Sequence, residues 1–244
     1  MKKKFLILGL PLIAMVTLAN CSKDDDDEQP PVQEPQSPAF TVSGSVAGFD
    51  YVDLGLASGL KWAKCNVGAT SETDYGKYFQ WASTVGYYKD EQGAIDNSTW
   101  VTTQYQTVNT TSYSATKFTK YLGSTDSTYK DPTATDENAL KTVLDASDDA
   151  ATANMGGKWR MPTTEEFREL YDNTRNEWVK NYQGSGVSGR LFTSKVNGQT
   201  LFFPAAGYCN NGSVGNVGSS ALVWSSSLNT SSPFDAYRLY FYSS

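Results

Sequence analysis

Few side chains in this 244-residue chain could carry out chemistry, and histidine is absent from the whole sequence. Without histidine, a Ser-His-Asp triad, a Cys-His pair and a histidine-based zinc site are all impossible. Two acidic pairs remain, Glu165 with Glu166 and Asp145 with Asp148. Glycosidases need two carboxylates that face each other across a cleft, whereas neighbouring acids on one helix serve capping and solubility. The sequence therefore predicts a protein that is not an enzyme and has no cofactor.

The cysteines allow a second kind of chemistry. Cys65 and Cys209 lie well inside the chain, far from Cys21 near the N-terminus. An exported protein can form disulfides, so Cys65 and Cys209 are candidates for one. Two separate buried thiols are the alternative, because free cysteine is often a small core residue.

An acidic loop is the remaining candidate for metal binding. The stretch TDSTYKDPTATDEN (residues 125–138) offers oxygen ligands to a hard cation such as calcium. It does not fit a twelve-residue calcium loop, and the two sequence triplets of a lectin calcium site are missing. We therefore predict no metal site, with calcium kept as an alternative.

The N-terminus has the pattern of an export signal. Lys2, Lys3 and Lys4 precede the apolar run FLILGLPLIAMVTLA. A charged segment followed by such a run is typical of a secretory signal peptide, and the run is shorter than the roughly 20 residues that span a bilayer. We predict a signal peptide over residues 1–20.

The residues at its end resemble a bacterial lipobox: Leu18, Ala19, Asn20 and Cys21. The resemblance implies that Cys21 becomes the first mature residue and carries a lipid on its sulfur. Asn20 departs from the pattern, which has Gly, Ala or Ser there. An ordinary signal peptide with an incidental cysteine is the alternative.

The residues after the cysteine resemble the surface-export signal of Bacteroidetes lipoproteins. They are Ser22, Lys23, Asp24, Asp25, Asp26 and Asp27. Residues 21–45 are acidic and proline-rich, so they cannot bury enough apolar area to fold and should act as an extended tether. We expect an outer-membrane protein that is lipid-anchored and faces the cell exterior.

Charge and aromatic content bear on the partners. The formal net charge is −6, which argues against nucleic acid as a partner because that needs a basic stripe. Tyr87, Tyr88 and Trp100 stand among Asn, Thr and Ser in a loop-rich stretch, where exposed rings suit a glycan or a surface protein. The alternative is that these rings belong to the core, as we expect for Trp81.

Two helices are predicted in the middle of the chain. In residues 136–146, Leu140, Val143 and Leu144 form a modest apolar stripe. The second helix is marked by a capping box of Thr163 with Glu166, followed by an apolar stripe. That stripe consists of Phe167, Leu170 and Tyr171.

Strands dominate the rest of the sequence. Residues 52–67 are predicted to form two strands around a glycine turn, and residues 85–132 a long variable loop region. Asn197-Gly198 indicates a hairpin with a type I′ turn. In the last strand, Tyr237, Leu239 and Phe241 share one face. Helices followed by antiparallel strands predict an α+β fold.

Several segments together resemble a known family. They are YVDLGLASGLKWAKCNVGA, DDAATANMGGKWRMPT and FFPAAGY. They are similar to the Fibrobacter succinogenes major paralogous domain, and more distantly to formylglycine-generating sulfatase-modifying proteins. The resemblance implies a C-type-lectin-like domain over residues 46–244, with two helices packed on a twisted antiparallel sheet and long loops. The segment Asp126 to Thr128 also resembles the O-glycosylation site of Bacteroidetes, which implies a glycan on Ser127.

The resulting expectation is a surface-exposed lipoprotein with a non-catalytic, ligand-binding domain, used for adhesion or contact with glycans or a host. A structural subunit of a fimbria or surface complex is one alternative. A sulfatase-modifying-like oxidase is another, but that family uses a copper-binding cysteine pair and only Cys209 lies in the corresponding region.

Overall fold

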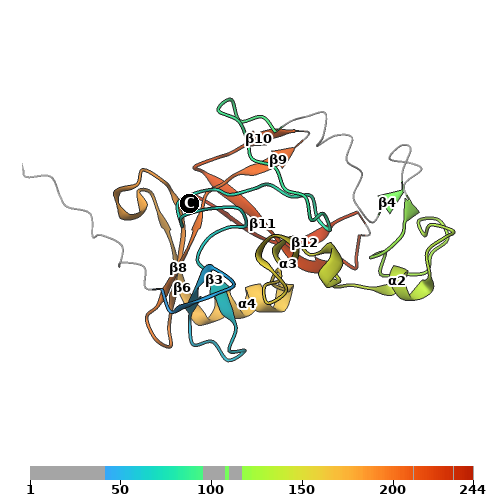
Figure 1. Cartoon of the computed structure of the whole chain (residues 1–244), viewed down its shortest axis with the longest axis horizontal. Coiled ribbons are helices and arrows are strands. Elements are labelled where there is room, and N and C mark those ends of the chain that lie inside the picture. Colours follow the sequence, from blue (N-terminus) through green and yellow to red (C-terminus); the bar gives the residue numbers. More distant parts are fainter. Residues whose placement is uncertain (1–41, 96–107, 110–116, 211, 233, 244) are drawn as a thin grey trace, which may run out of the picture. The chain divides into compact units, whose positions relative to one another are not determined.

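The computed structural model describes residues 42–95, 108–109, 117–210, 212–232 and 234–243 (Figure 1). Its α-helices are α2 (Asp136–Leu140), α3 (Ala150–Met155) and α4 (Thr164–Asn173), with short 3-10 turns η2 (Ala146–Asp148) and η3 (Tyr182–Gly184). Its strands are β1 (Gly44–Val46), β2 (Phe49–Asp53), β3 (Lys61–Ala63), β4 (Val108–Asn109), β5 (Lys117–Phe118), β6 (Thr174–Val179), β7 (Gly189–Ser194), β8 (Thr200–Pro204), β9 (Tyr208–Asn210), β10 (Ser213–Gly215), β11 (Ser220–Leu228) and β12 (Ala236–Tyr242).

The strands form small sheets whose named strands pair antiparallel. Two sheets have three strands, in the orders β1-β2-β3 and β6-β7-β8, and the longest pairing joins β11 to β12. The pairs β9-β10 and β4-β5 complete the set within the described residues. The predicted α+β class is therefore confirmed.

The main core lies where α4 meets these sheets. Phe167 and Leu170 of α4 are buried against residues of β2, β3, β7, β8, β11 and β12. The other buried members of this cluster are Val52, Leu54, Leu56, Trp62, Phe192, Leu201, Phe203, Ala221 and Phe241. Burial of apolar surface of this kind contributes roughly 25 cal/mol per Å², so α4 is stabilised chiefly by its contacts with the sheets.

The predicted start of α4 is confirmed in detail. The Thr163 hydroxyl accepts a hydrogen bond from the Glu166 backbone N–H at 3.3 Å, and the Glu166 carboxylate accepts one from the Thr163 N–H at 2.8 Å. Arg160 donates two further bonds of 2.8 and 2.6 Å to the same carboxylate. The predicted stripe is narrower than expected, because Tyr171 is exposed.

We expect Glu166→Gln to destabilise the domain by about 1–2 kcal/mol at neutral pH, the range for losing a helix cap or a charged hydrogen bond. Burial raises the pKa of Glu166, but the hydrogen bond from Arg160, the Thr163 N–H and the Arg160 charge together outweigh it and leave the pKa below 4.5. A lowered folded-state pKa gives stability that is present above pH 4.5 and lost as the pH falls through the folded value. Thermal unfolding from pH 7 to pH 3 should show the difference from wild type shrinking in acid.

Glu165→Gln is the matched control, because Glu165 is the exposed neighbour on the same helix turn. It should change stability by less than about 0.5 kcal/mol. A difference between wild type and Glu166→Gln that stays constant down to pH 3 would contradict the role given to the charge.

The helix expected over residues 136–146 is shorter than predicted. α2 ends at Leu140, and both Leu140 and Val143 are exposed, so the stripe does not exist. Lys141 is extended, and the Leu144 N–H donates to the Ser226 carbonyl at 3.0 Å. Backbone pairing with β11 therefore replaces the helix, and only Leu144 of the three is buried.

The β7-β8 hairpin is confirmed, but its turn is not type I′. That turn needs a positive φ at both central residues, and here Gly198 has a φ of 75° while Asn197 does not adopt positive φ. The Ser194 hydroxyl accepts from the Val196 and Asn197 N–H groups, at 3.0 and 3.3 Å, and donates to the Leu54 carbonyl at 2.6 Å. A longer turn held by Ser194 therefore fixes the hairpin against Leu54, the residue directly after β2.

Alternation along β12 follows the prediction except at its start. Phe241 is buried and Leu239 half-buried, whereas Tyr240 and Tyr242 are exposed. Tyr237 is also exposed, although its position in the alternation predicts the inner face. It lies opposite the bulge in β11, where the register shifts between Trp224 and Leu228.

Candidate functional site

A cavity of about 850 Å³ lies between the small sheets and α3. Its lining comes from segments far apart in the chain: residues 59–67 around β3, residues 75–81, α3 with residues 158–162, β8, β9 and β11. Protein interiors are packed about as densely as organic crystals and leave few voids larger than a water molecule. A hollow of this size falls in the range of small-molecule sites, so it is the leading candidate for a binding site.

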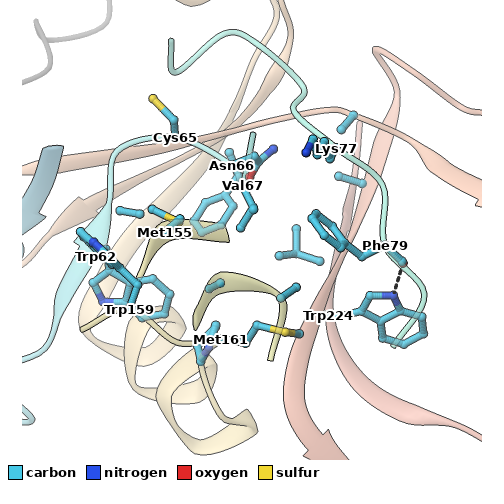
Figure 2. Close-up of a pocket in the computed structure, with 18 of the residues that line it drawn as sticks. Trp62, Cys65, Asn66, Val67, Lys77, Phe79, Met155, Trp159, Met161 and Trp224 are labelled. Atoms are coloured by element: carbon cyan, nitrogen blue, oxygen red, sulfur yellow. Dashed lines mark hydrogen bonds between the residues drawn. The ribbon is translucent and has the colours of Figure 1, made fainter. Parts of the chain in front are cut away.

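Aromatic rings form two opposite walls of this cavity, which we call the aromatic cavity. Figure 2 shows Trp62 and Trp159 on one side and Phe79 and Trp224 on the other. The indole N–H of Trp159 donates to the Val46 carbonyl at 3.1 Å, and that of Trp224 donates to the Phe79 carbonyl at 3.1 Å. These bonds fix the orientation of two of the rings.

Trp62 is as buried as Trp159, but its indole N–H differs from those of the other two indoles. It is only 8% exposed and its ring centre lies 5.9 Å from that of Phe167. Its Nε1 is buried and has no hydrogen-bond partner among the described residues. Buried indole N–H groups usually find a partner, so this unsatisfied donor is an exception among the described residues.

Asp149 holds one wall in place. Its carboxylate accepts the Thr152 N–H at 2.8 Å, which caps α3, and the Met161 N–H at 2.8 Å, which ties down the segment carrying Trp159. Thr152 in turn donates its hydroxyl to the Trp159 carbonyl at 2.8 Å. Asp149 therefore caps this short helix, and the cap also positions the cavity wall.

Positive charge prevails along the cavity lining. The charged residues of the lining are Lys61, Lys64, Lys77, Lys158, Arg160 and Glu166. Arg160 neutralises Glu166, the one carboxylate of the lining, through the bidentate pair described above. Lys61 pairs with Asp53, which lies outside the lining.

Two of the remaining ammonium groups form no ion pair with any residue that the structure describes. Lys64 pairs with Glu72 at 3.3 Å. Within the part of the chain that the structure describes, Lys77 and Lys158 form no ion pair. Lys77 instead has its Nζ 5.4 Å from the centre of the Tyr88 ring. The cavity is thus a positive region in a chain of net charge −6.

Both interior cysteines line the cavity as free thiols. Cys65 and Cys209 are each half-buried and unpaired with one another, so the structure has the two-thiol alternative and not the disulfide. Burial raises the pKa of Cys65 to about 11, and burial also raises the pKa of Cys209. Since the thiolate is the reactive form, these thiols are poor nucleophiles at neutral pH.

The three aromatic residues predicted to bind ligand are placed differently. Tyr87 is half-buried, forms an antiparallel bridge with Tyr78 and packs against the small core of Tyr78 and Ile95. Tyr88 is exposed and donates its hydroxyl to the Gly68 carbonyl at 2.7 Å. Trp100 lies outside the described residues. The expectation for Trp81 is met, since it packs on Tyr121 of the core.

The acidic pairs of the sequence have structural partners. Glu165 is exposed beside the capping residue Glu166. Asp148 is buried, accepts from the Tyr121 hydroxyl at 2.6 Å and pairs with Lys120 at 2.8 Å, so it does not cap α3. Asp145 shares Lys120 and also pairs with Lys141. These carboxylates belong to an ionic network and do not face one another across a cleft.

The remaining predicted sites are the glycosylation residue, the lipid anchor with its export signal, and a metal site. Ser127 is exposed in a turn, and its carbonyl accepts from Lys117 at 3.1 Å. Cys21 and the export residues Ser22 to Asp27 lie outside the described residues. Among the described residues, no group of three or more Cys, Asp or Glu side chains is placed to hold a metal ion.

The residues that matter most in the cavity were not predicted as a site. Trp62, Phe79, Trp224 and Lys77 come from three separate segments, and nothing in their spacing links them. Six tryptophans in one chain are the sole hint in the sequence. Only the tertiary fold brings these residues together.

Comparison with other proteins gives no further lead to the site. In the described part of the chain, no helix is both long and apolar enough to span a bilayer. No family model, no curated protein and no solved structure matches this chain.

Proposed function

We propose that this protein is a lipid-anchored protein of the outer cell surface whose folded domain binds a ligand without catalysis, in contact with glycans or a host. The observation that carries the binding function is the aromatic cavity. Its walls of indole and phenyl rings and its volume of about 850 Å³ support a ligand site. Ring faces give large contact area at low entropic cost.

Two features favour binding over catalysis. The thiols in the cavity are held protonated, as the raised pKa of Cys65 indicates. The carboxylate in the lining, Glu166, is engaged by Arg160 and by the Thr163 N–H. Neither group is placed as a free nucleophile or general base.

The family and the anchor belong to the same proposal. The antiparallel sheets with α3 and α4 are compatible with a C-type-lectin-like domain, and the motif GGKWRMPT contributes Trp159 and Met161 to the cavity. Cys21 would provide the lipid, and Ser22 to Asp27 the export signal. The partners would be the membrane, through the anchor, and a glycan or surface protein, through the domain.

We expect Trp224→Ala to weaken binding at least tenfold while the fold survives. Trp224 is half-buried on β11, and a central aromatic residue of a binding site commonly contributes 2 kcal/mol or more. Glycan arrays probed with the full chain, followed by titration of the ligands found, would measure the loss. The thermal midpoint of each variant should be recorded alongside.

Two variants serve as comparisons for Trp224→Ala. Tyr240→Ala removes an exposed ring outside the cavity lining and should leave binding unchanged. Tyr88→Ala removes the exposed ring originally predicted to bind. If Tyr88→Ala abolished binding while Trp224→Ala did not, the binding face would lie on the outer loops and not in the cavity.

A further inference from the structure

The charge of the aromatic cavity contrasts with the charge of the chain. Five cationic residues and one carboxylate line it, in a protein whose formal net charge is −6. Three of the five cations are paired with carboxylates, which leaves Lys77 and Lys158 without an ion pair among the described residues. Low-dielectric walls strengthen the field of charges that line a cleft. The lining therefore favours a negative group in the cavity over a neutral or positive one.

Lys77 is the cation best placed to meet such a group. In Figure 2 it lies at the end of the cavity where Asn66 and Val67 are, above the space between the two aromatic walls. Its backbone N–H donates to the Val67 carbonyl at 2.9 Å, and its ammonium lies 5.4 Å from the Tyr88 ring centre. The Tyr88 ring steadies the ammonium but leaves its full charge in place.

The carboxylates near this end of the cavity either have other partners or are exposed to solvent, and they lie outside the lining. Glu72 pairs with Lys64 at 3.3 Å. Asp74 accepts the N–H groups of Thr70 and Gly76, both at 3.1 Å. Asp50 is exposed, and none of the three carboxylates belongs to the lining. None of the three forms an ion pair with Lys77.

The opposite wall supplies aromatic rings. Trp62 and Trp159 belong to the lining there, although each is only 8% exposed. The lining thus combines aromatic rings with the Lys77 ammonium, which forms no ion pair within the described residues.

We propose that the ligand of the aromatic cavity is a ring compound bearing a carboxylate, with its ring between the aromatic walls and its acid group at Lys77. This inference rests on the proposed binding function and adds the chemical class of the ligand. The same chemistry could come from an acidic sugar or from an aromatic acid, and the experiment separates these two sources.

Two matched pairs of probes test the proposal by calorimetry on the full chain in a non-ionic detergent. Methyl glucuronide is compared with methyl glucoside, and indole-3-acetate with indole-3-acetamide. Within at least one pair, the acid should bind at least tenfold more tightly than its neutral partner. The pair that shows this preference identifies the source as a sugar or an aromatic acid.

Lys77→Met should remove that preference while keeping the apolar stem of the side chain over Tyr88. We expect a loss of about tenfold for the acid and less than twofold for the neutral partner. Lys180→Met is the matched control, because Lys180 is an exposed lysine outside the lining. If Lys77→Met fails to fold, wild-type affinity at 50 and 500 mM salt replaces it, and only the acid should weaken, since salt screens the charge.

The outcomes distinguish the two proposals. If acid and neutral partner bind equally, and Lys77→Met or salt changes neither, the binding function stands and the acidic ligand is excluded. If none of the four probes nor any array glycan binds, the proposed function itself fails. A preference for the acid that Lys180→Met removes as well as Lys77→Met would overturn the role of Lys77.

Discussion

Asp149→Ala is expected to lower the free energy of unfolding by about 3–6 kcal/mol, because it removes a buried carboxylate that accepts two hydrogen bonds of about 1.5–3 kcal/mol each. Asp149 is 3% exposed, so water cannot replace it as the acceptor for the Thr152 and Met161 N–H groups. For a domain of this size, 1 kcal/mol corresponds to about 2–4 °C in the thermal midpoint. We therefore expect the midpoint to fall by roughly 10 °C.

The same variant should also weaken ligand binding, since the Met161 N–H bond holds the segment that carries Trp159. Calorimetric unfolding and titration with the ligand would measure both effects. Asp149→Asn keeps an acceptor oxygen and should lose less than Asp149→Ala. Asp172→Ala, at an exposed aspartate near the end of α4, should change stability by less than about 0.5 kcal/mol. An Asp149→Ala midpoint within 2 °C of wild type would contradict the role of this carboxylate.

Cys21→Ala is expected to release the protein from membranes completely. Under the proposed function, the lipid on this sulfur is the attachment, and stable anchoring needs two or more acyl chains. Fractionation of cells and labelling with a palmitate analogue would measure the loss. Cys65→Ala is the control, because Cys65 lies in the folded domain and should stay with the membrane fraction. A Cys21→Ala protein that remains membrane-bound and still takes up the label would refute the anchor.

Local signals in the sequence predicted local structure well. The capping box of Thr163 and Glu166 depends on residues three positions apart, and it begins α4 where predicted. The alternation of β12 and the β7-β8 hairpin likewise depend on neighbours in sequence. In each case, the residues that form the sequence pattern are also those that make the stabilising contacts.

Predictions failed where a distant segment competed for the same backbone groups. The helix over residues 136–146 ends early because Leu144 pairs with Ser226, more than 80 positions away. The turn at Asn197 is reshaped because its side-chain amide donates to the Asp53 carbonyl at 2.9 Å. Helix propensity and turn preference contribute a few tenths of a kcal/mol to about 1 kcal/mol per residue, so a small number of tertiary hydrogen bonds overrides them.

The candidate site was predicted least well, for a related reason. Tyr87 and Tyr88 were selected from local composition, yet Tyr87 packs on a small core and Tyr88 supports Lys77 from outside. The cavity walls pair Trp62 with Trp159 and Phe79 with Trp224, which are separated by about 100 positions or more. No local pattern in a single sequence indicates that rings so far apart in the chain lie close together in the fold.

The bond between Trp159 and Val46 has a mechanical consequence for an anchored protein. Val46 belongs to β1, the first strand of the described fold, which pairs antiparallel with β2 as a three-residue hairpin. If the chain is held at its N-terminus by a lipid and at its cavity by a bound ligand, tension enters the domain through β1. A hairpin pulled from its free end opens one hydrogen bond at a time, which takes little force.

Peeling β1 as far as Val46 would withdraw the carbonyl that holds the Trp159 indole, and Val46 itself lines the cavity. Flow or movement that stretches the tether would therefore displace the Trp159 wall of the cavity, which contacts the ligand. The lifetime of the protein–ligand complex would then depend on the tension in the tether. It would be shorter while the tether is stretched and would return to its unloaded value when the tension is released.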